Sequence, residues 1–466
     1  MFVILNKFSN NCQPSNSLFS LIIFSKVMVF AFKPYLVLLI FALISCTSCR
    51  KDQISLEPKT TPVYEIPEQV EQLSGDNIPA DAQLVNVGTG SGNLIVDGKT
   101  LQIKGNAKIV ITEGSYQTIT LKNLIAGNDF RIFVKVSGAV RVIKSMYTDN
   151  LKNVTISGDF NGALKYGFVF ENIEYRAILM NGSLCGVTLK NIKFKNVDNY
   201  VIAGERSNGK DFPNLDTQET RTEKFKILNC LFDNAGTISF GGSFDKNKRE
   251  DTGLFKDVEI AHNIFQNTDA GSVCSFTNVQ DYDIHHNVVN NVNFSNNNHN
   301  GIFFMEGNGN FHDNKLTNYQ GNAIRMWLYS RGNTPETNMI YNNICYNTRK
   351  YGAFELQAFE RHILPSKTTY VNAKVFNNTV GRMNTSKDWD GQILDLYNTG
   401  GSLEFYNNLG FELVSNTGQP SNMIHNLSGV RPVTDRNNQY FTKLTDAVND
   451  DVNLQSKIQG IGATIR

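Results

Sequence analysis

This chain of 466 residues lacks the features that mark several large protein classes. Only 19% of its residues are charged and its formal net charge is +1, which argues against the basic stripe that nucleic-acid binding requires. The predicted strands contain few cysteines, and their spacing indicates neither a disulfide framework nor a zinc site. We interpret these cysteines as buried thiols; they are Cys185, Cys230, Cys274 and Cys345.

An imperfect repeat is the main feature that the sequence does contain. Similar strings recur every 24 to 38 residues: VTLKNIKF, FKILNCLF, VEIAHNIF, DYDIHHNVV, NGNFHDNKL, NMIYNNICY, AKVFNNTV and SLEFYNNL. Their shared apolar column is Leu189, Ile227, Ile260, Ile284, Phe311, Ile340, Val375 and Phe405. Two residues later stand Asn191, Asn229, His262, His286, Asp313, Asn342, Asn377 and Asn407.

Consecutive copies then carry a further asparagine: Asn263, Asn287, Asn314, Asn343, Asn378 and Asn408. Asparagine tolerates the left-handed backbone of a tight bend, and its amide can bond the equivalent amide of the next coil. Self-similarity with variable insertions indicates a solenoid, and short β-rich runs without capped helices indicate a β-helix. The sequence therefore predicts an all-β solenoid with an asparagine ladder.

Each copy continues with two more predicted strands. The second has an inward apolar residue, and the third is seen in GTISF, GSVCSF, GIFFME, GNAIRMW, YGAFELQ and GQILDLY. Long excursions often follow the third strand, which indicates loops beside one sheet.

Three strands per coil, an asparagine ladder and long loops beside one sheet resemble the right-handed parallel β-helix of the pectate-lyase-like superfamily. This resemblance implies three sheets, with the substrate cleft on the sheet formed by the third strands. The C-terminal run DDVNLQSKIQGIGATI also resembles the closing segment of bacterial β-helix proteins.

Alternation along the third strands separates inward from outward side chains. In AIRM, AFEL and ILDL the outward residues are Arg325, Glu355 and Asp395, which we predict to be catalytic. Aromatic and polar residues on the same face predict sugar binding, because rings stack on sugar faces while polar groups bond hydroxyls. The substrate-binding candidates on the sheet are Phe304, Glu306, Trp327, Gln357 and Tyr397, and those in overhanging loops are Lys387 and Arg361, with Arg331 and His362 nearby.

Several chemistries are open to this face. Adjacent coils lie ~4.8 Å apart, so Glu355 and Asp395 suit the ~5–5.5 Å carboxyl separation of a retaining glycosidase. A uronate lyase would instead use Arg325 to neutralise the substrate or abstract a proton. Glu306, Glu355 and Asp395 could also hold Ca²⁺, which takes several oxygen ligands.

Plainer interpretations compete with these. The charged residues of the face could be an exposed ladder that serves solubility. His262 and His286 stand in the asparagine column and are interpreted as turn or stacking residues, while His299 could border the cleft. The chain also lacks the paired-Asp strings of polygalacturonases and the Asn-Lys-Ser and Arg-His-Gly strings of the chondroitinase and alginate lyase type.

The N-terminal region resembles a bacterial lipoprotein leader. The apolar run PYLVLLIFALIS ends at Leu43-Ile44-Ser45-Cys46, which resembles a lipobox in which Cys46 receives the lipid. A plain signal peptide or a short membrane anchor is the alternative. We expect a signal peptide over 1–46, with Met28 as an alternative start, a flexible tether over 47–80 and the β-helix over 81–466.

These observations predict an envelope lipoprotein that cleaves polysaccharide by elimination or hydrolysis. The alternatives are a non-catalytic glycan-binding or structural surface protein and, third, a polymer-level sugar epimerase. We expect a monomer attached by its N-terminal lipid to the outer membrane or cell surface of a bacterium, with polysaccharide as partner and Ca²⁺ as the one candidate cofactor.

Overall fold

A computed structural model describes residues 76–465, except 161, 183, 205, 208–209, 212–220, 242–243, 246–249, 252, 296, 359–367, 398–399 and 428–432. The chain divides into Met1–Glu68 and Gln69–Arg466, and every described residue belongs to the second unit. The predicted leader, Cys46 and most of the tether therefore lie outside the described residues. Among the residues described, no helix is long and apolar enough to cross a membrane.

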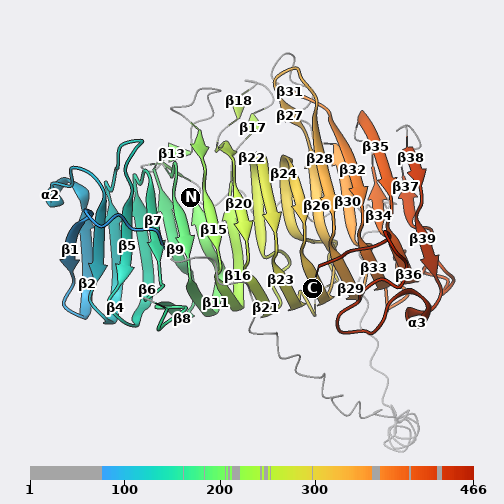
Figure 1. The fold of residues 1–466 in the computed structure, drawn as a ribbon, viewed down its shortest axis with the longest axis horizontal. Helices are drawn as coiled ribbons and strands as arrows, with labels where there is room; N and C mark the ends of the chain where they lie inside the picture. The colour runs from blue at the N-terminus through green and yellow to red at the C-terminus, as the bar shows by residue number, and fades with distance from the viewer. Residues whose placement is uncertain are drawn as a thin grey trace, which may run out of the picture. The chain divides into compact units, whose positions relative to one another are not determined.

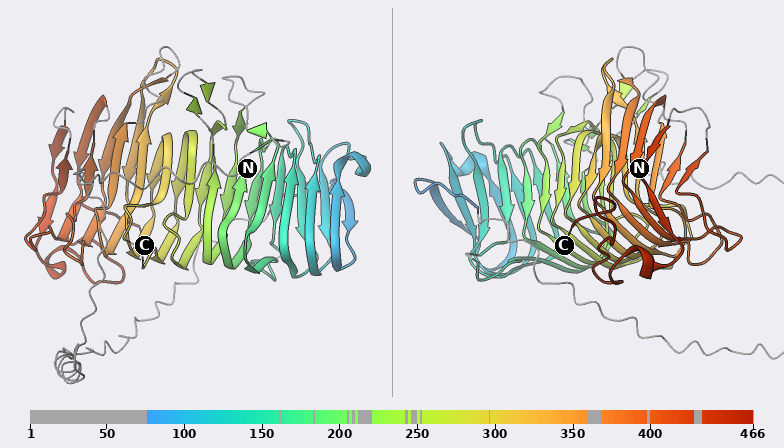
Figure 2. Two further views of the ribbon diagram at one scale, coloured as in Figure 1. Left: turned by 180° about the vertical axis from the view of Figure 1, so that it is seen from behind. Right: turned by 45° about the vertical axis from the view of Figure 1, so that its right-hand side comes forward.

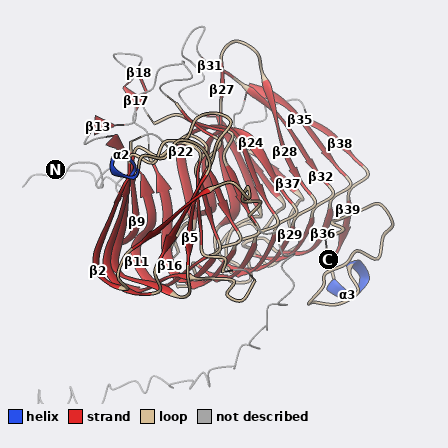
Figure 3. Ribbon diagram, turned by 60° about the vertical axis from the view of Figure 1, so that its left-hand side comes forward, coloured by secondary structure: helices blue, strands red, loops and turns tan. Residues whose placement is uncertain are grey.

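The described unit is a right-handed parallel β-helix, as predicted. Consecutive coils lie beside one another, so the colour in Figure 1 changes steadily from blue to red along the stack. Figure 2 shows the same order from behind, and Figure 3 shows that strands make up almost all of the regular structure. Each coil contributes to three parallel sheets, which we number by the order of their strands in the repeat.

The first sheet comprises β1 (Gln83–Val87), β3 (Ala107–Ile111), β5 (Ile132–Val136), β7 (Val154–Ser157), β10 (Thr188–Lys190), β15 (Lys226–Leu228), β20 (Glu259–Ala261), the ends of β22 (Cys274–His285) and β24 (Gly301–His312), β28 (Glu336–Tyr341), β32 (Val371–Phe376), β35 (Gly400–Tyr406) and β38 (Val433–Arg436). Two short strands, β14 (Thr222–Glu223) and β19 (Phe255–Lys256), precede β15 and β20 and pair with each other, and β19 also pairs with β22.

The second sheet comprises the beginnings of β2 (Ser91–Asp97), β4 (Gly114–Lys122), β6 (Val140–Asp149), β11 (Ile192–Gly204) and β16 (Leu231–Phe240), together with β8 (Phe168–Ile173), β21 (Ile264–Thr268), β23 (Val288–Val292), β25 (Lys315–Tyr319), β29 (Ile344–Thr348), β33 (Thr379–Met383), β36 (Leu409–Leu413) and β39 (Gln439–Phe441).

The third sheet comprises the ends of β2, β4, β6, β11 and β16, then β9 (Arg176–Asn181), the beginnings of β22 and β24, β26 (Asn322–Leu328), β30 (Phe354–Ala358), β34 (Leu394–Leu396) and β37 (Ile424–Asn426). Antiparallel pairs form in the excursions: β12 (Arg206–Ser207) with β13 (Lys210–Asp211), β17 (Phe244–Asp245) with β18 (Glu250–Asp251), and β27 (Ser330–Arg331) with β31 (Thr368–Thr369). The labelled hairpin strands lie along one edge of the stack in Figure 1. The helices α2 (Gly98–Leu101) and α3 (Leu444–Ala447) are single turns.

The repeat packs its predicted inward residues inside the coils. Every member of the apolar column from Leu189 to Phe405 is buried. In the second sheet the inward phenylalanines stack coil upon coil, with ring centroids 5.2, 4.9 and 4.6 Å apart; they are Phe170, Phe194, Phe232 and Phe265. Cys230, Cys274 and Cys345 are buried free thiols as expected, whereas Cys185 is half-buried.

The two polar columns of the repeat have separate roles at the turn from the first to the second sheet. Members of the first column take the left-handed backbone, with φ of 57° at Asn191 and 54° at Asn407. Members of the second column are buried and form the ladder: Asn287 Nδ2 donates to Asn314 Oδ1 at 3.0 Å, and Asn314 Nδ2 donates to Asn343 Oδ1 at 3.1 Å. One residue makes the bend, and its neighbour joins the coils.

Candidate active site

The third sheet brings the predicted catalytic residues into one outward column. Phe304 of β24 pairs with Arg325 of β26, Arg325 with Glu355 of β30, and Glu355 with Asp395 of β34. The same pairing continues from Asp395 to His425 of β37. The register expected from strand alternation is therefore confirmed, while the catalytic role of these residues stays a prediction.

A second outward column runs beside the first. Trp327 pairs with Glu306 on one side and with Gln357 on the other. The Phe304 and Trp327 rings meet edge to face with centroids 5.2 Å apart, and the Arg325 guanidinium lies 5.9 Å from the Trp327 ring. Phe304, Trp327 and Gln357 are half-buried and so retain surface that a ligand can contact.

The outward carboxylates are not exposed, contrary to expectation. Glu355 is 0% exposed, Asp395 2% and Glu306 7%. The first two carboxylates are held by side chains of β26 and of the segments that lead into the third strands. An exposed ladder that serves solubility is therefore wrong for Glu355 and Asp395, because burying a carboxylate costs several kcal/mol unless partners offset it.

Arg325 and His299 hold the Glu355 carboxylate from two sides. Arg325 Nε and Nη2 both lie 2.9 Å from Glu355 Oε1, and His299 Nε2 lies 3.1 Å from Oε2. Arg325 Nη1 also donates to the His299 carbonyl at 2.8 Å. A Cβ at Gly301 would lie 2.8 Å from Arg325 Cγ, so glycine at this position leaves room for the arginine.

Glu355 remains ionised in this setting. Burial by itself raises the pKa of a carboxyl group, but here the hydrogen bond from His299 and the positive charge of Arg325 outweigh it. The net pKa of Glu355 is below its ordinary value. The residue is therefore a poor proton donor near neutral pH.

His299 is positioned by contacts on its edge and on its face. Its Nε2 is hydrogen-bonded to Asn322 Oδ1 at 2.8 Å and lies 3.1 Å from Glu355 Oε2, an ion-pair distance. Its ring stacks on Tyr351 at a centroid distance of 4.1 Å and an interplanar angle of 14°. The Trp389 ring lies 5.4 Å from that of Tyr351. The imidazole consequently has a defined orientation.

Tyr351 has an unusual backbone. Its φ is +73°, a region that bulky residues rarely adopt, and its side chain is buried. The Tyr351 hydroxyl donates to the Asn297 carbonyl at 3.3 Å. Local strain of this kind costs ~1–3 kcal/mol and clusters at functional sites. Here it places the phenol ring against His299.

Asp395 sits in a second polar cluster beside Glu355. Asn322 Nδ2 donates to Asp395 Oδ2 at 3.3 Å, and Gln392 Nε2 donates to Oδ1. His425 Nδ1 lies 3.7 Å from Asp395 Oδ1. The neighbouring Asp395 carboxylate raises the pKa of His425 above its ordinary value, against the opposing effect of burial. Asn322 therefore links Asp395 to His299.

Tyr397 follows Asp395 on the same face. Burial raises its pKa to about 12, and the negative charges of Glu355 and Asp395 contribute. Tyr397 is half-buried and its phenol keeps its proton at neutral pH, so it can donate that proton to a bound molecule.

Two of the three carboxylates considered as calcium ligands, Glu355 and Asp395, contact nitrogen donors in this structure. The third carboxylate, Glu306, lies in the other outward column, where its strand neighbour is Trp327. In the Glu355 column, Arg325 is the strand neighbour of both Phe304 and Glu355. Glu355 already binds two nitrogen donors, and Asp395 binds two side-chain amides. A cation that needs several oxygen ligands would have to displace these groups, and shared Ca²⁺ ligation stays a prediction.

The loop residues predicted to lie near the substrate are found in different settings. Arg361 and His362 lie outside the described residues. Lys387 is exposed, and its aliphatic stem lies beside Gly418. Trp389, two residues after Lys387, lies beside Tyr351 in the His299 cluster and is 42% exposed. Arg331 donates its backbone N–H to Gln280 Oε1.

Sequence reasoning missed several members of the cluster. His299 was considered only as a border residue, and Tyr351, Asn322, Trp389 and His425 were not considered. A signal existed for His425, because it follows Asp395 by one repeat, at the outward position of the next third strand.

No family model matches the chain, and no curated protein sequence matches it. Among solved structures the chain is similar to the PL6 family polysaccharide lyase Pedsa3628 from Pseudopedobacter saltans, with 13% identity and a TM-score of 0.44 over 80% of this chain and 97% of that one. It is similar to the PL6 family alginate lyase AlyGC, with 11% identity and a TM-score of 0.41 over 80% of this chain and 57% of that one. The A-module of the Azotobacter vinelandii mannuronan C-5 epimerase AlgE4 gives 10% identity and a TM-score of 0.30, over 72% and 91% of the two chains. These likenesses concern the fold alone, and the strand pairing described above establishes that fold independently.

Proposed function

We propose that this protein cleaves an acidic polysaccharide by elimination on the third sheet, with His299 as the proton acceptor. One observation carries the proposal: the fully buried Glu355 carboxylate holds His299 in place while Arg325 holds the carboxylate. A base oriented by a buried, ionised group is the arrangement that proton abstraction requires.

The aromatic side chains around this group suit a sugar chain. Trp389 and Tyr351 lie on one side of His299, while Phe304 and Trp327 lie beside Arg325 on the other. Rings present apolar surface to sugar faces, and the amides and charges between them can bond hydroxyls and carboxylates. The Tyr351 ring is buried against His299, so a polymer chain laid across successive coils would contact Trp389 on one side and Phe304 and Trp327 on the other.

Elimination needs a base, a proton donor and a cation, and the site offers each. Because Nε2 of His299 faces Glu355 and Asn322, Nδ1 is the nitrogen that takes the proton from the carbon beside the sugar carboxylate. The electron pair of that C–H bond forms the new C=C bond as the C–O bond to the leaving sugar breaks. The Tyr397 hydroxyl then donates its proton to the leaving oxygen.

Arg325 would meet the substrate carboxylate. Its bonds to Glu355 and to the His299 carbonyl use Nε and one hydrogen of each terminal nitrogen, which leaves one N–H on each. The side chain is 17% exposed, so it can reach a ligand without leaving Glu355. A charge-assisted hydrogen bond from Arg325 would stabilise the negative charge that develops on the carboxylate.

The site suits hydrolysis less well. A retaining glycosidase requires one carboxyl as an accessible nucleophile and the other as a protonated acid. Glu355 is 0% exposed, which does not suit the nucleophile, and its lowered pKa does not suit the protonated acid.

We further propose, from the lipobox-like Cys46, that a lipid anchors the protein to the outer face of a bacterial envelope.

The test uses the full-length protein and a panel of uronate-containing polysaccharides. We expect both new reducing ends and the ultraviolet absorbance of an unsaturated product. His299→Ala is expected to remove both signals, whereas His312→Gln, which alters a histidine of the first sheet, is expected to retain them.

The other outcomes identify the alternatives. Reducing ends without unsaturation would mean hydrolysis and would overturn the elimination step. Inverted sugars in an uncut polymer would mean an epimerase. Saturable binding with no product across the panel would mean a non-catalytic glycan-binding protein.

A further inference from the structure

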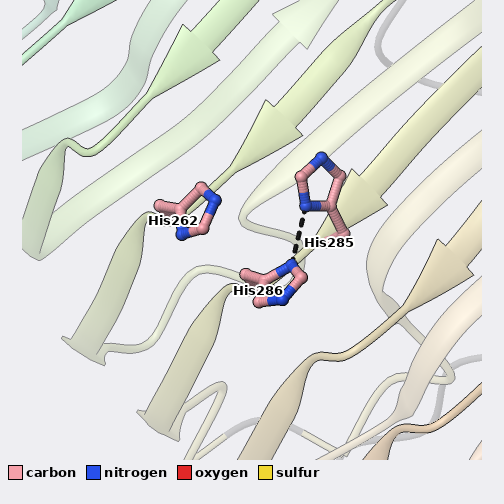
Figure 4. A group of neighbouring side chains, drawn as sticks. All are labelled: His262, His285 and His286. Carbon is pink, nitrogen blue, oxygen red and sulfur yellow. Dashed lines mark hydrogen bonds between the residues drawn. The ribbon is translucent and has the colours of Figure 1, made fainter. Parts of the chain in front are cut away.

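A group of histidines lies at the turn from the first to the second sheet. His262 follows β20, His285 ends β22 and His286 follows it, so the group spans two consecutive coils. One ligating nitrogen from each of the three lies within 4.8 Å of the others, and Figure 4 shows the three rings together. Among the described residues, this is the group of histidine, cysteine and acidic side chains whose ligand atoms converge as a metal site requires.

Backbone geometry explains why the rings meet. His262 and His286 have φ of 57° and 52° and occupy the left-handed position that asparagine occupies in other coils, as the sequence suggested. Their rings stack with centroids 4.9 Å apart, because the positions are equivalent on neighbouring coils. His285 crosses both rings nearly at right angles, at 86° and 87°. Its edge therefore faces the stacked pair.

The orientation of His285 favours ligation. Its Nε2 lies 3.5 Å from Glu259 Oε1, and Glu259 is in turn paired with Lys226. Its Nδ1 lies 2.8 Å from Nδ1 of His286, the contact drawn in Figure 4. A carboxylate on the far nitrogen of a histidine is the arrangement that fixes the tautomer of metal-binding histidines. The nitrogen facing His286 then presents its lone pair.

We propose that His262, His285 and His286 bind one divalent first-row transition ion, with Zn²⁺ as the best fit. Imidazole nitrogen suits Zn²⁺, Cu²⁺ and Ni²⁺, while Ca²⁺ and Mg²⁺ prefer oxygen. With Zn–N bonds of ~2.0–2.1 Å, tetrahedral ligand nitrogens lie ~3.3 Å apart. His285 and His286 are already closer than this, and His262 must approach them. Water would complete the fourth position, and His286 releases its Nδ1 proton, or moves it to Nε2, as the ion binds.

His312 is close to the group but does not belong to it. Its ring stacks on His285 with centroids 5.0 Å apart, yet its Nδ1 lies 2.6 Å from Asp313 Oδ2 and its Nε2 lies 2.9 Å from Asp283 Oδ1. Both nitrogens are occupied by carboxylates. His312 is therefore a matched histidine that should not contribute to binding.

The proposed ion would join two coils on a different sheet from the candidate active site. It would stabilise the folded chain and leave catalysis unchanged, since the group lies at the turn from the first to the second sheet and the proposed catalysis is on the third. The proposal is thus independent of the proposed function.

The test is a Zn²⁺ titration of the untagged full-length protein by calorimetry, with Co²⁺ absorption as a second probe. Asparagine fills the His262 and His286 positions in other coils, so His262→Asn/His286→Asn should fold with an unchanged metal-free Tm. We expect one Zn²⁺ per wild-type chain, a Tm that rises with Zn²⁺, and affinity at least ~100-fold weaker in the double variant.

His312→Gln is the control and should bind Zn²⁺ as the wild type does, whatever its effect on stability. Undetectable binding to the wild type would overturn the proposal. Equal binding by the double variant, or loss of binding in His312→Gln, would also overturn it, because the ligands would then lie elsewhere. A tetrahedral Co²⁺ spectrum that disappears only in the double variant would support it.

Discussion

The ladder turn and the outer face of the third sheet use buried polar side chains in opposite ways. At the turn, Asn287, Asn314 and Asn343 are neutral, nearly identical in setting and bonded in an unbroken series. On the third sheet, Glu355 and Asp395 are charged, and each has a different set of partners. Equivalent residues in successive coils build the solenoid, while the polar residues that differ from coil to coil lie on the sheet where catalysis is proposed. The two regions should respond to mutation differently.

The largest expected effect is on turnover at the third sheet. His299→Ala should lower kcat by ~10²–10⁴, because a positioned general base contributes about this factor. Glu355→Gln should lower kcat through the orientation of His299, with a smaller effect on KM. Steady-state kinetics on the best polysaccharide of the panel would measure both.

The control for these variants is thermal unfolding. His299→Ala should still unfold cooperatively, at a Tm below that of the wild type, because buried Glu355 loses one of its partners. Full activity in both variants would mean that catalysis does not depend on this cluster of the third sheet.

A ladder variant should show the reverse pattern. Asn314→Ala removes the acceptor for Asn287 Nδ2 and the donor to the Ile284 carbonyl, both buried. We expect the free energy of unfolding to fall by ~2–5 kcal/mol, because each buried polar group left without a partner costs ~1–3 kcal/mol. Denaturant titration would measure the loss, and kcat of the remaining folded protein should not change.

Asn437→Gly provides the matched comparison, because Asn437 is an exposed turn residue with φ of 55°. Glycine adopts this conformation readily, so the loss should stay below ~1 kcal/mol. Equal losses in the two variants would contradict the distinction between the turn column and the ladder column.

The sequence predicted the repeating part of the molecule better than the site. Strand alternation has a period of two, so the outward positions of Arg325, Glu355 and Asp395 followed from aligned strings. Their burial did not follow, because the side chains that enclose them, His299 and Tyr351, come from connecting segments that share no common sequence. Nothing in the string around Tyr351 indicates a left-handed backbone. The sequence likewise did not show which asparagine column makes the turn and which forms the ladder, because that depends on the backbone conformation.

Acid should weaken the third-sheet cluster. The pKa of folded Glu355 is below its ordinary value, so its ionised form stabilises the protein above the unfolded pKa. That contribution disappears as the pH falls through the folded value. The stability difference between wild type and Glu355→Gln should therefore be largest near neutral pH and shrink below about pH 4.3. A difference that is constant with pH would contradict the ion pair.

The smallest effect belongs to His425, which is half exposed. Its pKa is raised by Asp395, so its positive charge stabilises the fold at low pH. That contribution is lost as the pH rises through the folded pKa, above the ordinary value of about 6.5. Comparing His425→Asn with wild type by thermal unfolding across this range should show a destabilisation confined to the acidic side.

The most direct test of the account is a crystal structure of the His299→Ala variant with an acidic oligosaccharide from the preferred polymer. We expect a chain across the third sheet between Trp389 and Trp327, with a sugar carboxylate at Arg325 and the adjacent C–H facing the position of the missing imidazole. An oligosaccharide bound on the first or second sheet, or one whose carboxylate points away from Arg325, would contradict it.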